Sequence, residues 1–153
     1  MYKYLLLLFS LTACAALTPF LEASFVLNET YTVNVGEKIL SIQTGDILVT
    51  DAKTGINEVL IYNGTANKIL HITYREFAIK PGQQLARDAF NQSFQYDLNE
   101  TKIIRYKDLQ IEIIKATSSQ LTFKVIAWER ENMKKELEKN RAIEQKYKET
   151  EWK

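Results

Sequence analysis

The chain is poor in the residues that build reactive or cross-linked sites. Its 153 residues include one cysteine and one histidine, which excludes a disulfide within the chain, a cysteine-rich zinc site and a Cys–His cluster. Charge of one sign is also missing, because 20 Lys and Arg oppose 19 Asp and Glu for a net charge of +1. Binding of nucleic acid through bulk positive charge is therefore not expected.

Motifs of enzymes are missing as well. The sequence contains no glycine-rich phosphate loop, no Gly-x-Ser-x-Gly and no His-Glu-x-x-His. Acidic residues fall mostly at turn positions, without the alternating spacing of a calcium-binding loop. We therefore expect neither an enzyme activity nor a cofactor or metal ion.

No hydrophobic run is long enough to cross a bilayer as a helix. The most apolar stretch, residues 5–13, has about nine residues, whereas a membrane-spanning helix needs roughly 20. Lys3 precedes this stretch as a short positive region, an arrangement typical of a targeting segment. Residues 1–13 are predicted to be a signal peptide.

The end of this segment, Leu11-Thr12-Ala13-Cys14, resembles the lipobox of bacterial lipoproteins. The resemblance implies cleavage before Cys14 and attachment of lipid to its thiol, which is the only thiol in the chain. It thus implies a lipid-anchored protein of the cell envelope. Since Ala15 rather than Asp follows, it implies the outer membrane, facing the periplasm or the cell surface, if the source is Gram-negative.

Two other destinations stay open. Ala13-Cys14-Ala15 is also a small-x-small site, so cleavage after Ala15 by an ordinary signal peptidase would release a soluble secreted β-protein. Asn-x-Ser/Thr triplets would accept glycans in a eukaryotic secreted chain. They begin at Asn28, Asn63, Asn91 and Asn99.

The mature chain is predicted to have three parts. Residues 14–24 are predicted to be a short lipidated tether, in which Phe20 and Leu21 could dock on the domain that follows. Residues 25–128 alternate apolar and polar side chains in short runs, which predicts a mainly β fold, a small antiparallel sandwich or barrel-like domain. Residues 129–153 are dense in both charges and are predicted to form a charged helix or tail.

Punctuating residues suggest where the strands end. Gly45-Asp46, Lys53-Thr54-Gly55 and Asn63-Gly64 are each predicted to be a turn. Residues 78–87 contain Pro81-Gly82 and are predicted to be a long loop. Residues 89–98 are predicted to be a half-buried strand with its aromatic residues on one face.

Several side chains are candidates for function. His71 and Arg75 are predicted to share one face of a strand with Glu76 on the other, which leaves His71 without a local acid partner. A pocket gathering His71 or Arg75 with two carboxylates would favour an enzyme. The strand aromatics are predicted to fill a core; an aromatic-lined cavity would instead favour a small ligand.

The function favoured by these features is a non-enzymatic binding or structural role at a membrane, in contact with another envelope protein. Lys80 and Arg87 in the predicted loop, and Trp152 in the tail, are the candidate partner-binding residues. A small-ligand-binding β-domain is the alternative.

Overall fold

The computed structural model describes residues 17–151, with side chains described for residues 17–146. These residues form a six-stranded and a four-stranded sheet, in which all neighbouring strands are antiparallel, and one long helix. The predicted class is confirmed, because the body is mainly β and sandwich-like with a C-terminal helix. In chain order the elements are β1 (Thr18–Ala23), β2 (Thr30–Asn34), β3 (Lys38–Ile47), β4 (Lys53–Ala66), β5 (Ile69–Lys80), β6 (Gln83–Ala86), a 3₁₀ turn (Asp88–Phe90), β7 (Gln92–Asp97), β8 (Ile103–Tyr106), β9 (Leu109–Ala116), β10 (Gln120–Trp128) and α1 (Glu131–Glu151).

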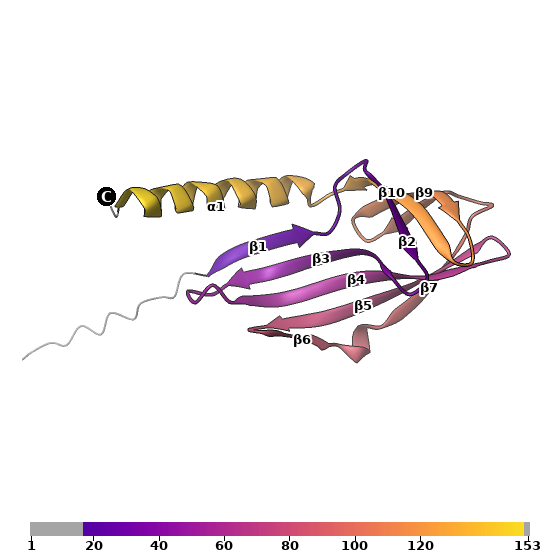
Figure 1. Cartoon of the computed structure of the whole chain (residues 1–153), viewed down its shortest axis with the longest axis horizontal. Coiled ribbons are helices and arrows are strands. Elements are labelled where there is room, and N and C mark those ends of the chain that lie inside the picture. Colours follow the sequence, from indigo (N-terminus) through magenta and orange to yellow (C-terminus); the bar gives the residue numbers. More distant parts are fainter. Residues whose placement is uncertain (1–16, 152–153) are drawn as a thin grey trace, which may run out of the picture.

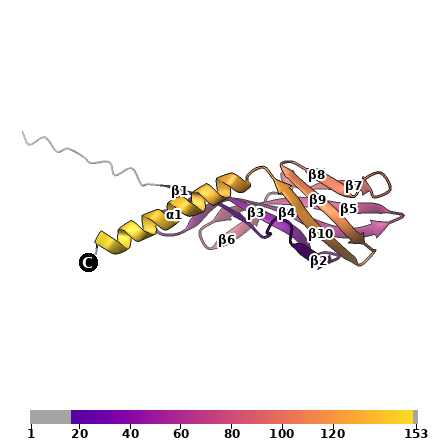
Figure 2. The ribbon, with the colours of Figure 1, turned by 90° about the horizontal axis from the view of Figure 1, so that it is seen from above.

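The larger sheet forms one layer of the body, and the smaller sheet and α1 lie over its two ends (Figure 1). Its order is β1-β3-β4-β5, after which β6 and β7 pair with opposite halves of β5. The smaller sheet, β2-β10-β9-β8, lies over one end of the long strands, and α1 extends over β1 at the other end (Figures 1 and 2). The molecule is therefore elongated, with a sandwich at one end and a helix-on-sheet layer at the other.

Aromatic and aliphatic side chains fill the space between the two sheets. Tyr62 and Phe123 are fully buried, and Phe94 and Tyr96 pack against the same cluster from β7. Burial alternates along β9 and β10, as expected for strands with one face toward a core. The prediction that most strand aromatics fill the interior is confirmed, although Phe90 lies in the 3₁₀ turn and is exposed.

Residues 18–23 correct the predicted tether. They form β1, an edge strand that pairs with β3 from Thr18–Ile47 to Ala23–Ile42. Phe20 and Leu21 are only 2% and 3% exposed, so burial of two large side chains offsets the cost of ordering this segment. Pro19 is tolerated because an edge strand does not need every N–H for pairing. The folded body therefore begins at residue 18 rather than 25.

The turns predicted at Gly45, Gly55 and Gly64 are wrong, because these glycines lie inside long strands. Gly45 and Gly55 do not turn the chain; they lie opposite each other inside β3 and β4, and the connection is at residues 48–52. Asn63-Gly64 lies within β4 next to a register shift between Tyr62 and Thr65. The β4–β5 turn is at Asn67-Lys68, where both residues have positive φ.

The helix α1 is confirmed, and it touches the sheet along a narrow stripe. Leu137 packs against the core cluster, and Arg141 lies 3.9 Å from Glu22 on β1. Glu131 and Lys135, four residues apart on the helix, form an ion pair at 3.3 Å. Within residues 17–151, no helix has the length and apolar character that crossing a bilayer requires.

Candidate functional site

Two carboxylates face each other near the middle of the larger sheet, of which Glu76 is buried and Glu58 is partly buried. Glu58 on β4 and Glu76 on β5 are directly opposite in the strand register, where two like charges would repel. The hydroxyl of Tyr74 lies between them, 2.8 Å from Glu76 Oε2 and 3.2 Å from Glu58 Oε1. The aromatic hydroxyl therefore links the two acids.

Three cations compensate this negative charge. Arg87, which follows β6, forms an ion pair with Glu76, whose side chain is 10% exposed. Lys107 in the β8–β9 turn forms an ion pair with Glu58. Arg130, immediately before α1, lies 3.4 Å from the second oxygen of Glu58. Each cation comes from a different part of the chain, so the carboxylate pair joins both sheets.

A third acid extends the network to the start of the helix. Asp108 accepts hydrogen bonds from the guanidinium of Arg130 and, at 3.0 Å, from the indole Nε1 of Trp128. The resulting charge network contains three carboxylates and three cations and is balanced. We define the charge network as Glu58, Tyr74, Glu76, Arg87, Lys107, Asp108 and Arg130.

The tyrosines beside the acids are held in their neutral form. Burial raises the pKa of Tyr74, and its hydrogen bond to Glu76 and the negative charge of Glu58 raise it further. Burial also raises the pKa of Tyr106, with a further contribution from Glu58. Both phenols therefore remain protonated well above the pH at which an exposed tyrosine ionises.

The charge network leaves little room for a substrate. The hollow between the layers at Tyr74, Tyr106 and Glu58 measures about 10 Å³, close to the smallest volume that holds one water. Every carboxylate of the network is already paired with a cation. The geometry suits a structural clamp between the two sheets and the helix, rather than a site for acid–base chemistry.

Arg87 and Lys80, the two candidates in the predicted loop, lie in different places. The loop prediction is wrong, because residues 78–87 form most of a β5–β6 hairpin that turns at Pro81-Gly82. Arg87 is held by Glu76 and lies 4.2 Å from the ring of Phe90. Lys80 is exposed at the hairpin end. The structure does not bring the two cations into one site.

A small cavity next to Arg87 gathers opposite charges. It measures about 120 Å³ and is lined by Arg75, Glu76, Arg87 and Asp88 among others. It therefore collects Arg75 with two carboxylates, the arrangement that would favour an enzyme. Glu76 is engaged by Tyr74 and Arg87, however, so it is not free to act as a base.

Lys80 borders an open hollow of about 590 Å³ between the ends of the β3–β4 and β5–β6 hairpins. The hollow is lined mainly by polar groups, including Gln43, Gln83 and Gln84. Below it, the buried Asn57 donates a 3.0 Å hydrogen bond to Gln84, while its own Oδ1 is buried with no hydrogen-bond partner. Amide and charged side chains, rather than aromatic rings, line this surface.

His71 lies in a second open hollow, on the outer face of β4, β5 and β7. This hollow measures about 610 Å³, and its lining includes Asn63, Ser93 and Gln95 but no carboxylate. Glu76 is buried on the inner face, as the strand alternation predicted. Among the described residues, no group of three or more His, Cys, Asp or Glu is arranged to hold a metal ion.

Two predicted site residues cannot be placed, and one group of interacting residues was not predicted. Cys14 and Trp152 lie outside the described residues. Sequence reasoning missed the charge network, although the period of two in β4 places Glu58 on the same face as Leu60 and Tyr62. Searches of protein-family models, curated proteins and solved structures found no match to this chain.

Proposed function

We propose that the chain is a lipid-anchored protein of the cell envelope that binds another protein and has no enzymatic role. The anchor part rests on the lipobox-like residues ending at Cys14. The body begins four residues later, at Thr18, and is a single β-structured unit clamped by the charge network. Such a body suits a protein that is held at a surface and presents a fixed shape.

We expect the partner protein to bind at the exposed edge of β6. All four residues of β6 are exposed, and this strand pairs with β5 on one side only. An unpaired edge offers backbone N–H and C=O groups to an extended segment of a partner. Lys80 and the amide-lined hollow lie next to this edge and would contact the side chains of such a segment. The larger sheet has two further edge strands: β7, which also pairs with β5 alone, and β1, which lies beside α1.

The small-ligand alternative has weaker support. Aromatic side chains fill the interior, and the hollow at Tyr74 and Tyr106 holds about 10 Å³. Ligand pockets are usually about 300 Å³ or more and largely apolar. The cavity near Arg75 combines two arginines with two carboxylates, so it offers no excess charge for an ion.

Lipidation is tested by labelling with radioactive palmitate in a bacterial host. We expect label in the full chain and none in Cys14→Ser. Equal labelling of the two chains, or a mature protein that starts after Cys14 without lipid, would reject the anchor.

Partner binding is tested with a photo-crosslinking amino acid placed at Gln84 on β6 in cells that make the protein. The matched control is the same amino acid at Lys115, which is exposed on β9 of the other sheet. We expect a discrete adduct from position 84 alone. Identical adducts from both positions, or none from position 84, would count against this edge as the binding surface.

A further inference from the structure

One end of the molecule collects the start of β1 and the tip of the β3–β4 hairpin. Thr18 pairs with Ile47, so the same register places Leu17 next to Leu48 at the hairpin tip. Leu17 is 55% exposed and Val49 is 73% exposed, the highest value among the large hydrophobic side chains that are exposed. We call this end, formed by Leu17 and residues 48–52, the anchor pole.

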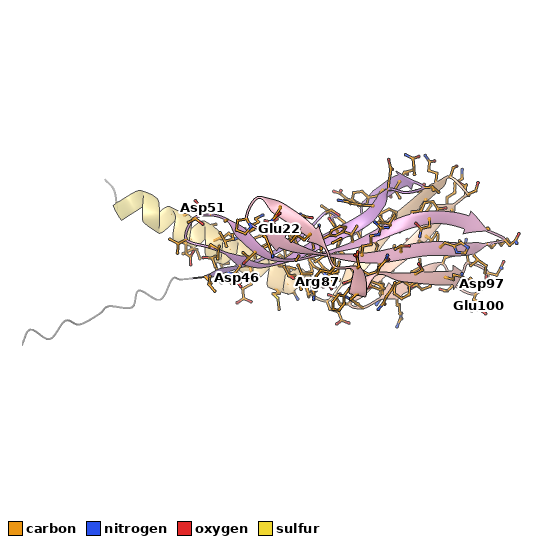
Figure 3. The ribbon with its side chains drawn as sticks, turned by 90° about the horizontal axis from the view of Figure 1, so that it is seen from below. Glu22, Asp46, Asp51, Arg87, Asp97 and Glu100 are labelled. Carbon is orange, nitrogen blue, oxygen red and sulfur yellow. The ribbon has the colours of Figure 1, made fainter. Side chains whose placement is uncertain are left out.

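The opposite end of the body lies far along the strands. Figure 3 shows Asp46 and Asp51 near the anchor pole, and Asp97 and Glu100 at the other end of the elongated body. Asp97 ends β7, and Glu100 lies in the turn that follows it. The helix α1 runs back along β1, and its C-terminal end extends beyond the β3–β4 hairpin tip at the same end of the molecule (Figures 1 and 2).

Chain length limits how far the anchor pole can lie from an acylated cysteine. Thr18 lies only four positions after Cys14, and four residues of fully extended chain cover at most about 14 Å. Lipid on Cys14 would therefore keep Thr18, and the hairpin tip paired beside it, close to the bilayer surface. Leu17 and Val49 are then exposed apolar side chains that lie close to the bilayer.

We propose that the anchor pole rests on the lipid bilayer, with Leu17 and Val49 in contact with the boundary between headgroups and acyl chains. The proposal rests on the proposed lipidation of Cys14. It orients the long axis of the body, with Glu100 and the β7–β8 turn facing away from the membrane. Lys80, near the anchor pole at the end of the β5–β6 hairpin, is then also close to the lipid surface.

Apolar contact, rather than charge, holds the pole on the membrane. Charges near it have both signs, because Asp46 and Asp51 accompany Lys53 and Lys80. A lipid surface recognised through this pole therefore does not need anionic headgroups. The contact is expected in vesicles of phosphatidylcholine alone.

Thiol chemistry gives a direct test, because a lipidated Cys14 has no free thiol. In the lipidated chain, Val49→Cys creates a single free thiol at the anchor pole, and Glu100→Cys is the matched control at the far end. Both positions are exposed, so neither change disturbs the core. Each variant is labelled with bimane and reconstituted in phosphatidylcholine vesicles that contain a lipid with a nitroxide near its headgroup.

We expect a loss of bimane fluorescence at position 49 and none at position 100. Equal fluorescence at the two positions, in a protein whose unsubstituted form takes up no bimane, would overturn the orientation while leaving the anchor intact. Uptake of bimane by the unsubstituted chain would show a free Cys14 thiol. That result would reject lipidation and, with it, this orientation.

Discussion

Gly45 and Gly55 lie directly opposite each other on β3 and β4, in a contact too close for any side chain. A Cβ on Gly45 would lie 1.9 Å from the carbonyl oxygen of Thr54, and a Cβ on Gly55 would lie 2.0 Å from that of Thr44. The obstructing atoms belong to the backbone, so they cannot rotate away as a flexible side chain would. These glycines let the two strands approach each other.

We expect Gly45→Ala and Gly55→Ala each to destabilise the protein by about 3 kcal/mol, because the strands must separate locally. The measurement is the free energy of unfolding from urea denaturation. Gly82→Ala is the control, since a Cβ there meets no atom within 4 Å and only its φ of +73° is unfavourable. A loss at Gly45 no larger than that at Gly82 would contradict the close approach.

Removal of β1 tests where the folded body begins. A chain starting at residue 25 loses Phe20 and Leu21, and the burial of each is worth about 1.5–3 kcal/mol. We expect it to unfold at a markedly lower urea concentration than a chain starting at residue 17. Equal midpoints would mean that residues 18–23 behave as the tether that the sequence predicted.

The charge network is expected to stabilise the junction of the sheets and the helix. Asp108→Asn should lower the free energy of unfolding by about 2 kcal/mol, because partly buried Arg130 loses its main counter-charge. Lys135→Met removes an exposed ion pair with Glu131 and should cost about 0.5 kcal/mol or less. Comparable losses of unfolding free energy in the two variants would show that the network is no more than surface charge.

Alkaline pH should separate the buried tyrosines from the others. Burial raises the pKa of Tyr74, Tyr96 and Tyr106 in the folded protein above the ordinary value of about 10. Below pH 10 these tyrosines stay protonated in the folded and the unfolded protein, so their effect on the free energy of unfolding does not change with pH. Above pH 10 the unfolded chain releases them first, so the stability falls as pH rises.

The phenolate absorbance near 295 nm measures this difference, because the phenolate absorbs there and the neutral phenol does not. We expect the folded protein to ionise fewer of its tyrosines at pH 11 than the urea-unfolded chain does. Tyr74→Phe should reduce the difference by about one tyrosine. Identical titrations of the folded and unfolded protein would exclude the buried environment.

Local patterns were enough to predict the class of fold. Strict alternation in runs such as residues 31–35 and 109–113 reflects one buried and one solvated face, which is a property of each strand alone. The charged helix could also be predicted from local sequence, because its many charges and its lack of glycine and proline do not depend on tertiary contacts.

Predictions failed where distant residues decide the outcome. Gly45 was predicted as part of a turn, but its role depends on Gly55 ten residues away. Glu58 and Glu76 are compensated by cations that follow β6, lie in the β8–β9 turn and connect β10 to α1, so their pairing depends on the tertiary structure. Cys14 and Trp152 lie outside the described residues, so the lipid anchor and the tail contact stay predictions.

The antiparallel pairing of β1 with β3 has a mechanical consequence for a protein attached through Cys14. Tension from the attachment would act along β1 and load its hydrogen bonds to β3 in shear. In shear the whole ladder shares the force at once, whereas peeling breaks one bond at a time. In a chain anchored through Cys14, this first strand would resist extraction when the membrane is deformed.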